Sequence, residues 1–422
     1  MNDSERAGFN RDIRDIFSIP VIVAALGYFV DIYDLILFGI VRVQSLKDIG
    51  VEPSEILNQG IFLLDMQMGG MLLGGFLWGI IGDKKGRLKI LFGSIFLYSA
   101  ANIANAYVES TSAYAVWRFI AGIGLAGELG AGVTLVLETL PRGLRGYGTT
   151  IVATVGVLGA VLANYIAKTF DWRMAYLIGG GLGMALLIMR IGVYESGMYK
   201  QIESSTISKG NFFMLFTNRQ RFLKYMKSIM IGLPIWFCVG ILILLSPEFA
   251  KALNVSGAVS AGEAVTACYV GLAFGDFSSG FLSQYLCCRR KVVLLFLILT
   301  SAASAGYFML DGVSSGFFYT FCGVIGFAVG YWALFITIAA EQFGTNIRAT
   351  VASTVPNIIR GTVIPITATF QFAKGYVGIL RAGEVVGIVC LLIAFYAYYH
   401  LDETFDKDLD YVEANVLPHV KI

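Results

Sequence analysis

Several ionisable residues of this sequence lie in the middle of long apolar stretches. Asp31 and Asp34 are three residues apart in the first stretch, so they project from about the same face if the stretch is helical. A charge in such a place costs several kcal/mol unless it is paired or hydrated, which makes each one a candidate for function. Two carboxylates this close do not both ionise readily, and the pattern predicts that one carries a proton near neutral pH. The alternative is that fixed cations of neighbouring helices hold both acids.

Arg118 and Glu128 belong to a later, glycine-rich stretch. If both apolar stretches are helices, Arg118 lies at a depth similar to that of Asp34. Glu128 follows roughly 15 Å further along its helix, at a rise of about 1.5 Å per residue. It can bind substrate or a cation, or it can be a buried acid that serves packing alone.

Arg360 lies in the segment 356–365, which reads PNIIRGTVIP. Its prolines and glycine loosen a helix and free backbone groups that can line a cavity. The arginine has no obvious acidic partner on its own helix, so an anionic substrate is a natural counter-ion for it. Asp276 and Glu384 are the alternative partners. We predict that Arg360 and Asn357 contribute to a substrate site.

Aromatic residues accompany these charges. Tyr33, Trp236, Tyr331 and Trp332 lie inside apolar stretches, where they can line a cavity. Aromatic residues are also the commonest interface anchors of membrane proteins, so the same residues can serve that purpose instead. All four are candidates for substrate contact.

The composition defines the class of protein that must position these residues. Hydrophobic residues make up 57% of the chain and charged residues 14%, and the mean hydropathy is +0.72. A soluble protein of 422 residues would need far more charge on its surface. Apolar runs of about 20 residues are long enough to cross ~30 Å of hydrocarbon as helices. The sequence predicts twelve such helices, at residues 18–42, 57–81, 89–107, 112–138, 147–168, 172–194, 226–247, 262–287, 291–311, 315–340, 350–373 and 378–400.

The distribution of cations predicts the orientation. Most of the 31 Lys and Arg residues fall in the tails and in alternate loops, which places both termini in the cytoplasm. The polar residues 1–15 contain no evident cleaved signal, so the first helix is expected to stay. The six cysteines lack metal-like spacing and are interpreted as small apolar residues. We expect neither a metal nor another cofactor.

Residues 195–225 interrupt the apolar pattern with a polar and basic linker. The interruption leaves one bundle of six helices at 1–194 and a second bundle, with a cytoplasmic tail, at 226–422. Two such bundles suggest a protein that rocks about a site at the membrane midplane.

A faint internal repeat relates the two halves. The sequence GFLWGIIGDKK at 75–85 is echoed by GFLSQYLCCRR at 280–290. Cys288 stands where the first copy has Asp83, so the second copy has lost its acid. We expect the second copy to lock a conformation less firmly.

The charged turn at residues 79–89 lies between the second and third predicted helices. It reads GIIGDKKGRLK, with glycines that allow close helix approach and cations that hold the turn on the cytoplasmic side. The spacing resembles G-x-x-x-D-[RK]-x-G-[RK]-x-[RK], the signature between helices 2 and 3 of the major facilitator superfamily. The resemblance implies an all-α membrane protein whose twelve transmembrane helices form two pseudo-symmetric six-helix bundles.

Two later junctions share another pattern. Glu138 is followed seven residues later by Arg145, and Glu341 by Arg348. Both junctions resemble the E-x-x-P-x-x-x-R-G element of the sugar-porter and metabolite:proton-symporter branches of that superfamily. The alternative is simple charge at helix ends. The resemblance implies a conformational gate formed by Asp83, Arg87, Glu138, Arg145, Glu341 and Arg348.

The resemblance also gives the intramembrane charges a role. In related symporters an arginine at the position of Arg118 pairs with the acid of the first helix, and protonation of that acid releases the pair. This implies a proton switch made by Asp34 and Arg118, with Asp31 and Glu128 as further proton-coupling candidates. An arginine at a depth comparable to that of Arg360 occurs in organic-anion branches of the family.

These features together predict a secondary transporter and not an enzyme. The expected activity is symport of a small organic anion, a carboxylate metabolite, with protons by alternating access. Sugar or phosphate symport, or export of a small solute by proton antiport, are the alternatives. The expected partners are the substrate, protons and the lipid bilayer of a bacterial inner membrane. We expect a monomer and no nucleic-acid partner.

Overall fold

The computed structural model describes residues 18–85, 87–140, 144–194 and 214–405. Within this part of the chain the regular elements are helices, and one isolated β-bridge joins Ser256 to Ser314. The abundance of apolar runs explains this result, because a helix satisfies all its backbone hydrogen bonds within a single segment.

The first half of the chain forms eight of these helices. They are α2 (Ile19–Asp48), α3 (Ile56–Lys85), α4 (Arg87–Asn105), α5 (Thr111–Leu125), α6 (Glu128–Thr139), α7 (Arg145–Val157), α8 (Gly159–Thr169) and α9 (Trp172–Tyr194). The second half contains α11 (Met214–Thr217), α12 (Arg219–Ile231), α13 (Leu233–Phe237), η2 (Cys238–Ile243), α14 (Ser246–Ala252), α15 (Ala261–Tyr285), α16 (Arg289–Tyr307), α17 (Ser315–Ala328), α18 (Trp332–Glu341), α19 (Thr345–Gly361) and α20 (Val363–Tyr399).

The described helices are long and apolar enough for many membrane crossings. Ten stretches meet this description by length and composition, and α4 contains a shorter apolar helix. One of the ten, Thr350–Tyr399, is broken at Gly378, whose φ of 78° is a left-handed conformation that favours glycine. This break makes two crossings from one stretch, so the arrangement fits the twelve helices that the sequence predicts.

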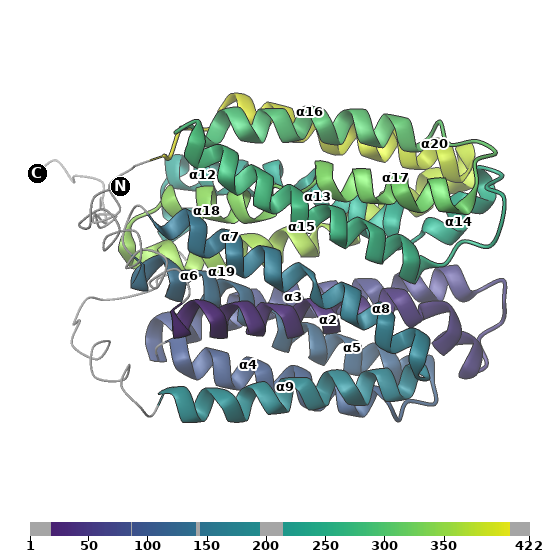
Figure 1. The fold of residues 1–422 in the computed structure, drawn as a ribbon, viewed down its shortest axis with the longest axis horizontal. Helices are drawn as coiled ribbons and strands as arrows, with labels where there is room; N and C mark the ends of the chain where they lie inside the picture. Colours follow the sequence, from purple (N-terminus) through teal and green to yellow (C-terminus); the bar gives the residue numbers. More distant parts are fainter. Residues whose placement is uncertain (1–17, 86, 141–143, 195–213, 406–422) are drawn as a thin grey trace, which may run out of the picture.

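Figure 1 shows the helices lying along a common direction in two groups. The helices of the first half, coloured purple to teal, lie together, and those of the second half, coloured teal to yellow, lie beside them. α19 packs on α3 and α6, and α15 packs on α2, α7 and α8, so these elements join the two groups. The linker is predicted to end at residue 225, but α12 already begins at Arg219.

We name the two ends of the molecule by their connections. The α2–α3 end is where α2 finishes and α3 begins, and the α3–α4 end is where α3 finishes and α4 begins. The α2–α3 end also carries α14 and the start of α15, whereas the α3–α4 end carries the junction of α15 with α16.

Several crossings are interrupted part-way, and the break between α17 and α18 is the best defined. Gly275 of α15 approaches Gly330 in this break so closely that a Cβ on either residue would collide with the other's backbone. Asp276 follows on α15, and its Oδ1 accepts a hydrogen bond of 3.1 Å from the backbone N–H of Ala333. The carboxylate thereby satisfies the N-terminus of α18, whose first residue is Trp332.

Candidate functional site

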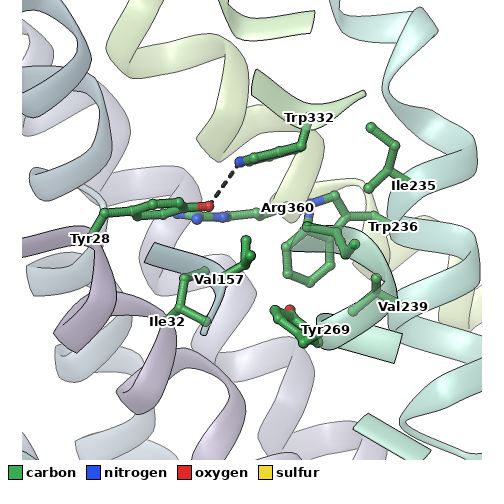
Figure 2. Close-up of a pocket in the computed structure, with 10 residues that line it drawn as sticks. Tyr28, Ile32, Val157, Ile235, Trp236, Val239, Tyr269, Trp332 and Arg360 are labelled. Atoms are coloured by element: carbon green, nitrogen blue, oxygen red, sulfur yellow. Dashed lines mark hydrogen bonds between the residues drawn. The ribbon is translucent and has the colours of Figure 1, made fainter. Parts of the chain in front are cut away.

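A small cavity of about 20 Å³ lies between the two groups of helices. This volume has room for a water molecule, so the halves must move apart before a small molecule can enter. Its wall is mainly apolar and aromatic and contains one charged side chain (Figure 2). The lining residues are Tyr28, Ile32, Val157, Ile235, Trp236, Val239, Tyr269, Leu272, Trp332 and Arg360.

Arg360 supplies that charge from α19, and it is fully buried. Its Nη2 lies 3.7 Å from Oδ2 of Asp31 on α2, and its Nη1 donates to Oδ1 of Asn357 over 3.5 Å. Its Cζ lies 5.6 Å from the ring centroid of Trp332 and 6.0 Å from that of Trp236. Among the described residues, Nε and Nη2 have no hydrogen-bond partner. The guanidinium is therefore held in place without its donors being used up.

Aromatic side chains from both halves surround this guanidinium. Trp332 donates its indole N–H to the hydroxyl of Tyr28 over 2.8 Å, which joins α18 to α2 (Figure 2). The rings of Trp236 and Trp332 meet edge to face, with centroids 6.4 Å apart. The Nε1 of Trp236 is buried and has no hydrogen-bond partner in the described part of the chain. The cavity wall thus offers a second unused donor beside Arg360.

Local backbone irregularity positions Trp236. Gly232 and Pro234 interrupt the crossing, so that the five-residue α13 follows α12. The π-helix η2 comes next and brings Val239 to the same cavity. Short π-helical segments inside α-helices are frequent at functional sites.

The two acids of α2 face different neighbours. Asp31 is directed to Arg360 of the other half, whereas Asp34 lies against Gly179 of α9, within its own half. The charge of Arg118 acts on Asp34, but these two side chains do not form a direct ion pair. Arg118 instead lies over the rings of Phe38 and Tyr176, at 5.4 and 5.7 Å from their centroids.

Glu128 has a strong structural partner in Arg190 of α9. Nη1 of Arg190 donates to one carboxylate oxygen over 3.1 Å, and Nη2 donates to the other. Nη2 also donates to the backbone carbonyl of Val23 over 3.2 Å. Gly27 makes room for the pair, because a Cβ there would overlap both side chains. This arrangement favours the packing role among the alternatives for Glu128.

Three of the other candidate substrate residues lie outside the cavity wall. The hydroxyl of Tyr33 donates to the carbonyl of Ala175 within the first half, and that of Tyr331 donates to the carbonyl of Ile231 within the second. Asn357 lies beside Arg360 and donates to the carbonyl of Ala126 over 2.8 Å, which connects the halves. Each of these polar groups is therefore already engaged by protein.

Most side chains of the predicted gate lie outside the part of the chain that the structure describes. The side chains of Asp83, Arg87, Glu138, Arg145 and Arg348 do not belong to the described part of the structure. Glu341 does, and its Oε1 accepts a hydrogen bond of 2.7 Å from Nη2 of Arg289 at the start of α16. Arg289 belongs to the repeat at 280–290, so this contact connects the two sequence patterns.

Polar contacts join the two halves on both sides of the cavity. Toward the α2–α3 end, Arg42 pairs with Glu248 over 2.7 Å, and Thr367 donates to the carboxylate of Asp65. Toward the α3–α4 end, the hydroxyls of Thr149 and Thr337 are 3.4 Å apart. Contacts between the two halves therefore lie on both sides of the cavity.

Sequence reasoning overlooked Tyr28, Tyr269 and Arg190. Tyr28 precedes Asp31 by three residues, so the helical spacing alone could have placed it on the same face. Arg190 lies near the end of an apolar stretch, where an arginine is easily interpreted as a cation of the adjacent loop. No pattern in the sequence singles out Tyr269.

The fold and the cavity define a multi-pass integral membrane protein with a small cavity between two helical halves. The model of the Major Facilitator Superfamily matches residues 24–368, so the chain belongs to this family of transporters and is not an enzyme. It is 26% identical over 428 residues to the niacin transporter NiaP of Acinetobacter baylyi, covering 92% of this chain and 94% of that protein. A benzoate transport protein of the same organism is 25% identical over 181 residues, covering 40% of this chain and 38% of that protein.

A solved structure shows the same fold. The proton:xylose symporter XylE superposes with a TM-score of 0.70 at 16% identity, covering 94% of this chain and 98% of that chain. Identity this low supports the shared fold alone. It therefore supports the twelve-helix architecture of this chain and says nothing about its substrate.

Proposed function

We propose that this transporter carries a small organic anion together with protons by alternating access. The observation that carries the proposal is Arg360, a fully buried cation at the wall of the cavity with unused donor nitrogens. A carboxylate can accept hydrogen bonds from this guanidinium, and such charge-assisted bonds are stronger than neutral ones. The Nε1 of Trp236 is a further donor for the same anion.

The aromatic wall favours a flat substrate. Trp236 and Trp332 lie beside the guanidinium, and Tyr269 belongs to the same cavity. Aromatic rings of a ligand prefer edge-to-face or offset contacts with such residues. Niacin and benzoate, the substrates in the names of the two relatives, are aromatic carboxylic acids of this kind. We therefore favour an aromatic monocarboxylate over a sugar or inorganic phosphate.

Proton coupling is the second part of the proposal. Asp31 and Asp34 are buried carboxylates on α2, and the charges of Arg360 and Arg118 act on them. A carboxylate held near a buried arginine can bind or release a proton when the arginine changes partner. We assign the coupling to these residues and regard Glu128 as part of a structural ion pair.

We extend the proposal to orientation and assembly. Because most loop cations are predicted on the α3–α4 side, we place that end in the cytoplasm, as expected for a bacterial inner membrane. We assign transport to a monomer, a proposal supported by the contribution of both halves of one chain to the cavity wall. The predicted gate residues at the α3–α4 end remain assigned to conformational locking.

The test is uptake of labelled nicotinate and benzoate into proteoliposomes. With an inside-alkaline pH gradient we expect saturable uptake that excess unlabelled substrate suppresses and a protonophore abolishes. Protonated weak acids also cross lipid unaided, so protein-free liposomes under the same gradient measure the background to be subtracted. Xylose and phosphate are assayed in parallel. Saturable uptake of xylose or of phosphate, without uptake of the aromatic acids, would refute the organic-anion assignment.

A further inference from the structure

A further arginine lies between the two halves, nearer the α2–α3 end than the cavity. Arg42 of α2 is 2% exposed, and its Nη2 donates to Oε1 of Glu248 on α14 over 2.7 Å. Its Nε and Nη1 are buried without a hydrogen-bond partner among the described residues, as are Oε2 of Glu248 and the hydroxyl of Ser246. Buried polar atoms seldom lack partners. Their concentration here indicates a place that serves another conformation of the protein.

The position of Arg42 follows from the contacts between α2 and the segment formed by η2 and α14. Ile32 of α2 and Val239 of η2 both line the cavity. Further along both elements, Gly39 approaches Leu244 so closely that a Cβ on the glycine would meet the leucine side chain. The ion pair of Arg42 comes next, about 15 Å beyond Ile32 at the rise of an α-helix. A solute that enters between these elements from the α2–α3 end therefore meets Arg42 before it reaches the cavity.

Opening of this end changes the surroundings of the arginine. Arg42 belongs to the first half and Glu248 to the second, so separation of the halves withdraws the acid from the guanidinium. Nη2 belongs to both edges at which a guanidinium forms two parallel hydrogen bonds with a carboxylate, and the departure of Glu248 frees it. A cation on the wall of an opening attracts anions, because the low-dielectric walls focus its field.

We propose that Arg42 is an outer subsite for the substrate anion, which binds the carboxylate while the α2–α3 end is open and before the anion reaches Arg360. The inference rests on the proposed function and adds a binding step at a position separate from the cavity. Binding is non-covalent, and Glu248 competes with the substrate for the same guanidinium. Closure of this end returns Arg42 to Glu248 and releases the anion.

Two variants that both lack the ion pair test the subsite, because they differ only in the charge at position 42. Glu248→Gln removes the competing acid and keeps Arg42, whereas the double variant with Arg42→Gln and Glu248→Gln removes both charges. Initial uptake of labelled benzoate into right-side-out membrane vesicles, under an inside-alkaline pH gradient, gives the KM of each variant. Vesicles without the transporter measure the background.

We expect the KM of Glu248→Gln to be about twofold to fivefold below that of the double variant, the scale of an ion pair that water reaches. The difference should shrink as the ionic strength rises. The matched control uses the exposed pair Lys168–Glu263, which also joins the halves. Glu263→Gln and the double variant with Lys168→Gln and Glu263→Gln should have nearly the same KM.

The outcomes separate this inference from the proposed function. Equal KM values for Glu248→Gln and its double variant would overturn the outer subsite and leave the organic-anion assignment standing. An equally large difference between the control variants would also overturn it, because it would indicate a general attraction of anions to the outer surface. Absence of saturable benzoate and nicotinate uptake by the wild type would contradict the organic-anion assignment itself, and the subsite with it.

Arg42→Lys decides the question if Glu248→Gln does not fold. Lysine keeps the charge and a partner for Glu248 but loses the planar fork that binds a carboxylate. The KM of Arg42→Lys should therefore exceed that of the wild type. A KM equal to that of the wild type would overturn the subsite.

Discussion

Arg190 and Arg360 are both buried arginines, yet they hold their charges differently. Arg190 contacts Glu128 through both of its terminal nitrogens, while Arg360 has a distant acid and lies between tryptophan rings at a cavity. A guanidinium that binds a carboxylate through two hydrogen bonds has a structural role, because removing the arginine or the acid leaves an unpaired buried charge. A guanidinium with free donors is available to a ligand.

The contrast predicts different effects of the same substitution. Arg360→Lys keeps the charge but loses the planar fork, so benzoate binding should weaken by roughly 1–3 kcal/mol, the scale of a hydrogen bond to a charged group. Arg190→Lys should instead lower the melting temperature and leave benzoate affinity near that of the wild type. Calorimetry and thermal unfolding of the two variants give both numbers. Normal affinity in Arg360→Lys would argue that Arg360 is not the anion ligand.

Residue type could identify some of these positions from the sequence, but partners could not be assigned. Arg360, Trp236 and Trp332 stand out because charged or bulky aromatic residues are unusual in apolar helices. The contact between Asp31 and Arg360 depends on how two halves of the chain meet, which no local pattern encodes. For the same reason the sequence shows Tyr28 on the helix face of Asp31 but does not show that its hydroxyl reaches the other half.

At the scale of elements, the repeat at 280–290 shows how a lost acid is replaced. Cys288 precedes α16, and its thiol donates to Oε2 of Glu403 over 2.9 Å. The carboxylate also accepts the backbone N–H groups of Arg289 and Arg290, over 3.0 and 3.1 Å. A carboxylate at this place satisfies orphan donors and complements the helix dipole. The segment after α20 thus supplies the charge that the repeat itself lacks.

The pKa of Glu403 indicates when this cap operates. Burial raises the pKa, but hydrogen bonds from Cys288, Phe405, Arg289 and Arg290 outweigh it and lower the pKa to about 2. Because the folded-state pKa is depressed, the stabilisation is complete above the ordinary value of 4.5 and is lost as pH falls toward about 2.

Glu403→Gln should therefore lower the melting temperature of the purified protein by a constant amount between about pH 8 and pH 5. The difference from the wild type should narrow in more acidic buffer, as the wild-type carboxylate becomes protonated. Thermal unfolding over this pH series checks both statements. A variant with the wild-type melting temperature at neutral pH would show that the cap does not stabilise α16.

The helices themselves were easier to predict than their ends and interruptions. Continuous apolar runs specify crossings because the bilayer requires their length, and hydrophobicity varies little across helix breaks. The break before Trp332 depends on the close contact of Gly275 with Gly330, which only the packed structure contains. α12 begins at Arg219, inside the segment 195–225 that the sequence assigns to the linker, and basic residues at a membrane surface do not mark such a helix start.

At the scale of the whole molecule, the two halves are held together unequally at the α2–α3 end. The Arg42–Glu248 pair is largely buried, with side chains 3% and 21% exposed. The Lys168–Glu263 pair also joins the halves, but its side chains are 58% and 33% exposed. Exposed ion pairs contribute little because water screens them and their side chains lose entropy, whereas breaking a buried pair leaves an uncompensated charge.

The Arg42–Glu248 pair should therefore be the main contact that keeps the two halves together on the proposed outer side of the cavity. In Arg42→Gln, a cysteine introduced by Leu272→Cys at the cavity wall should react several-fold faster with an impermeant maleimide added outside cells. In Lys168→Gln, the exposed counterpart, the rate should change little. The exposed native Cys287 at the α3–α4 end serves as an orientation control, because it should react only after the membrane is opened. If the Leu272→Cys cysteine is labelled equally fast with and without Arg42→Gln, the Arg42–Glu248 pair does not keep the outer side closed. Labelling of Cys287 in intact cells would show that the orientation is the reverse of the one proposed.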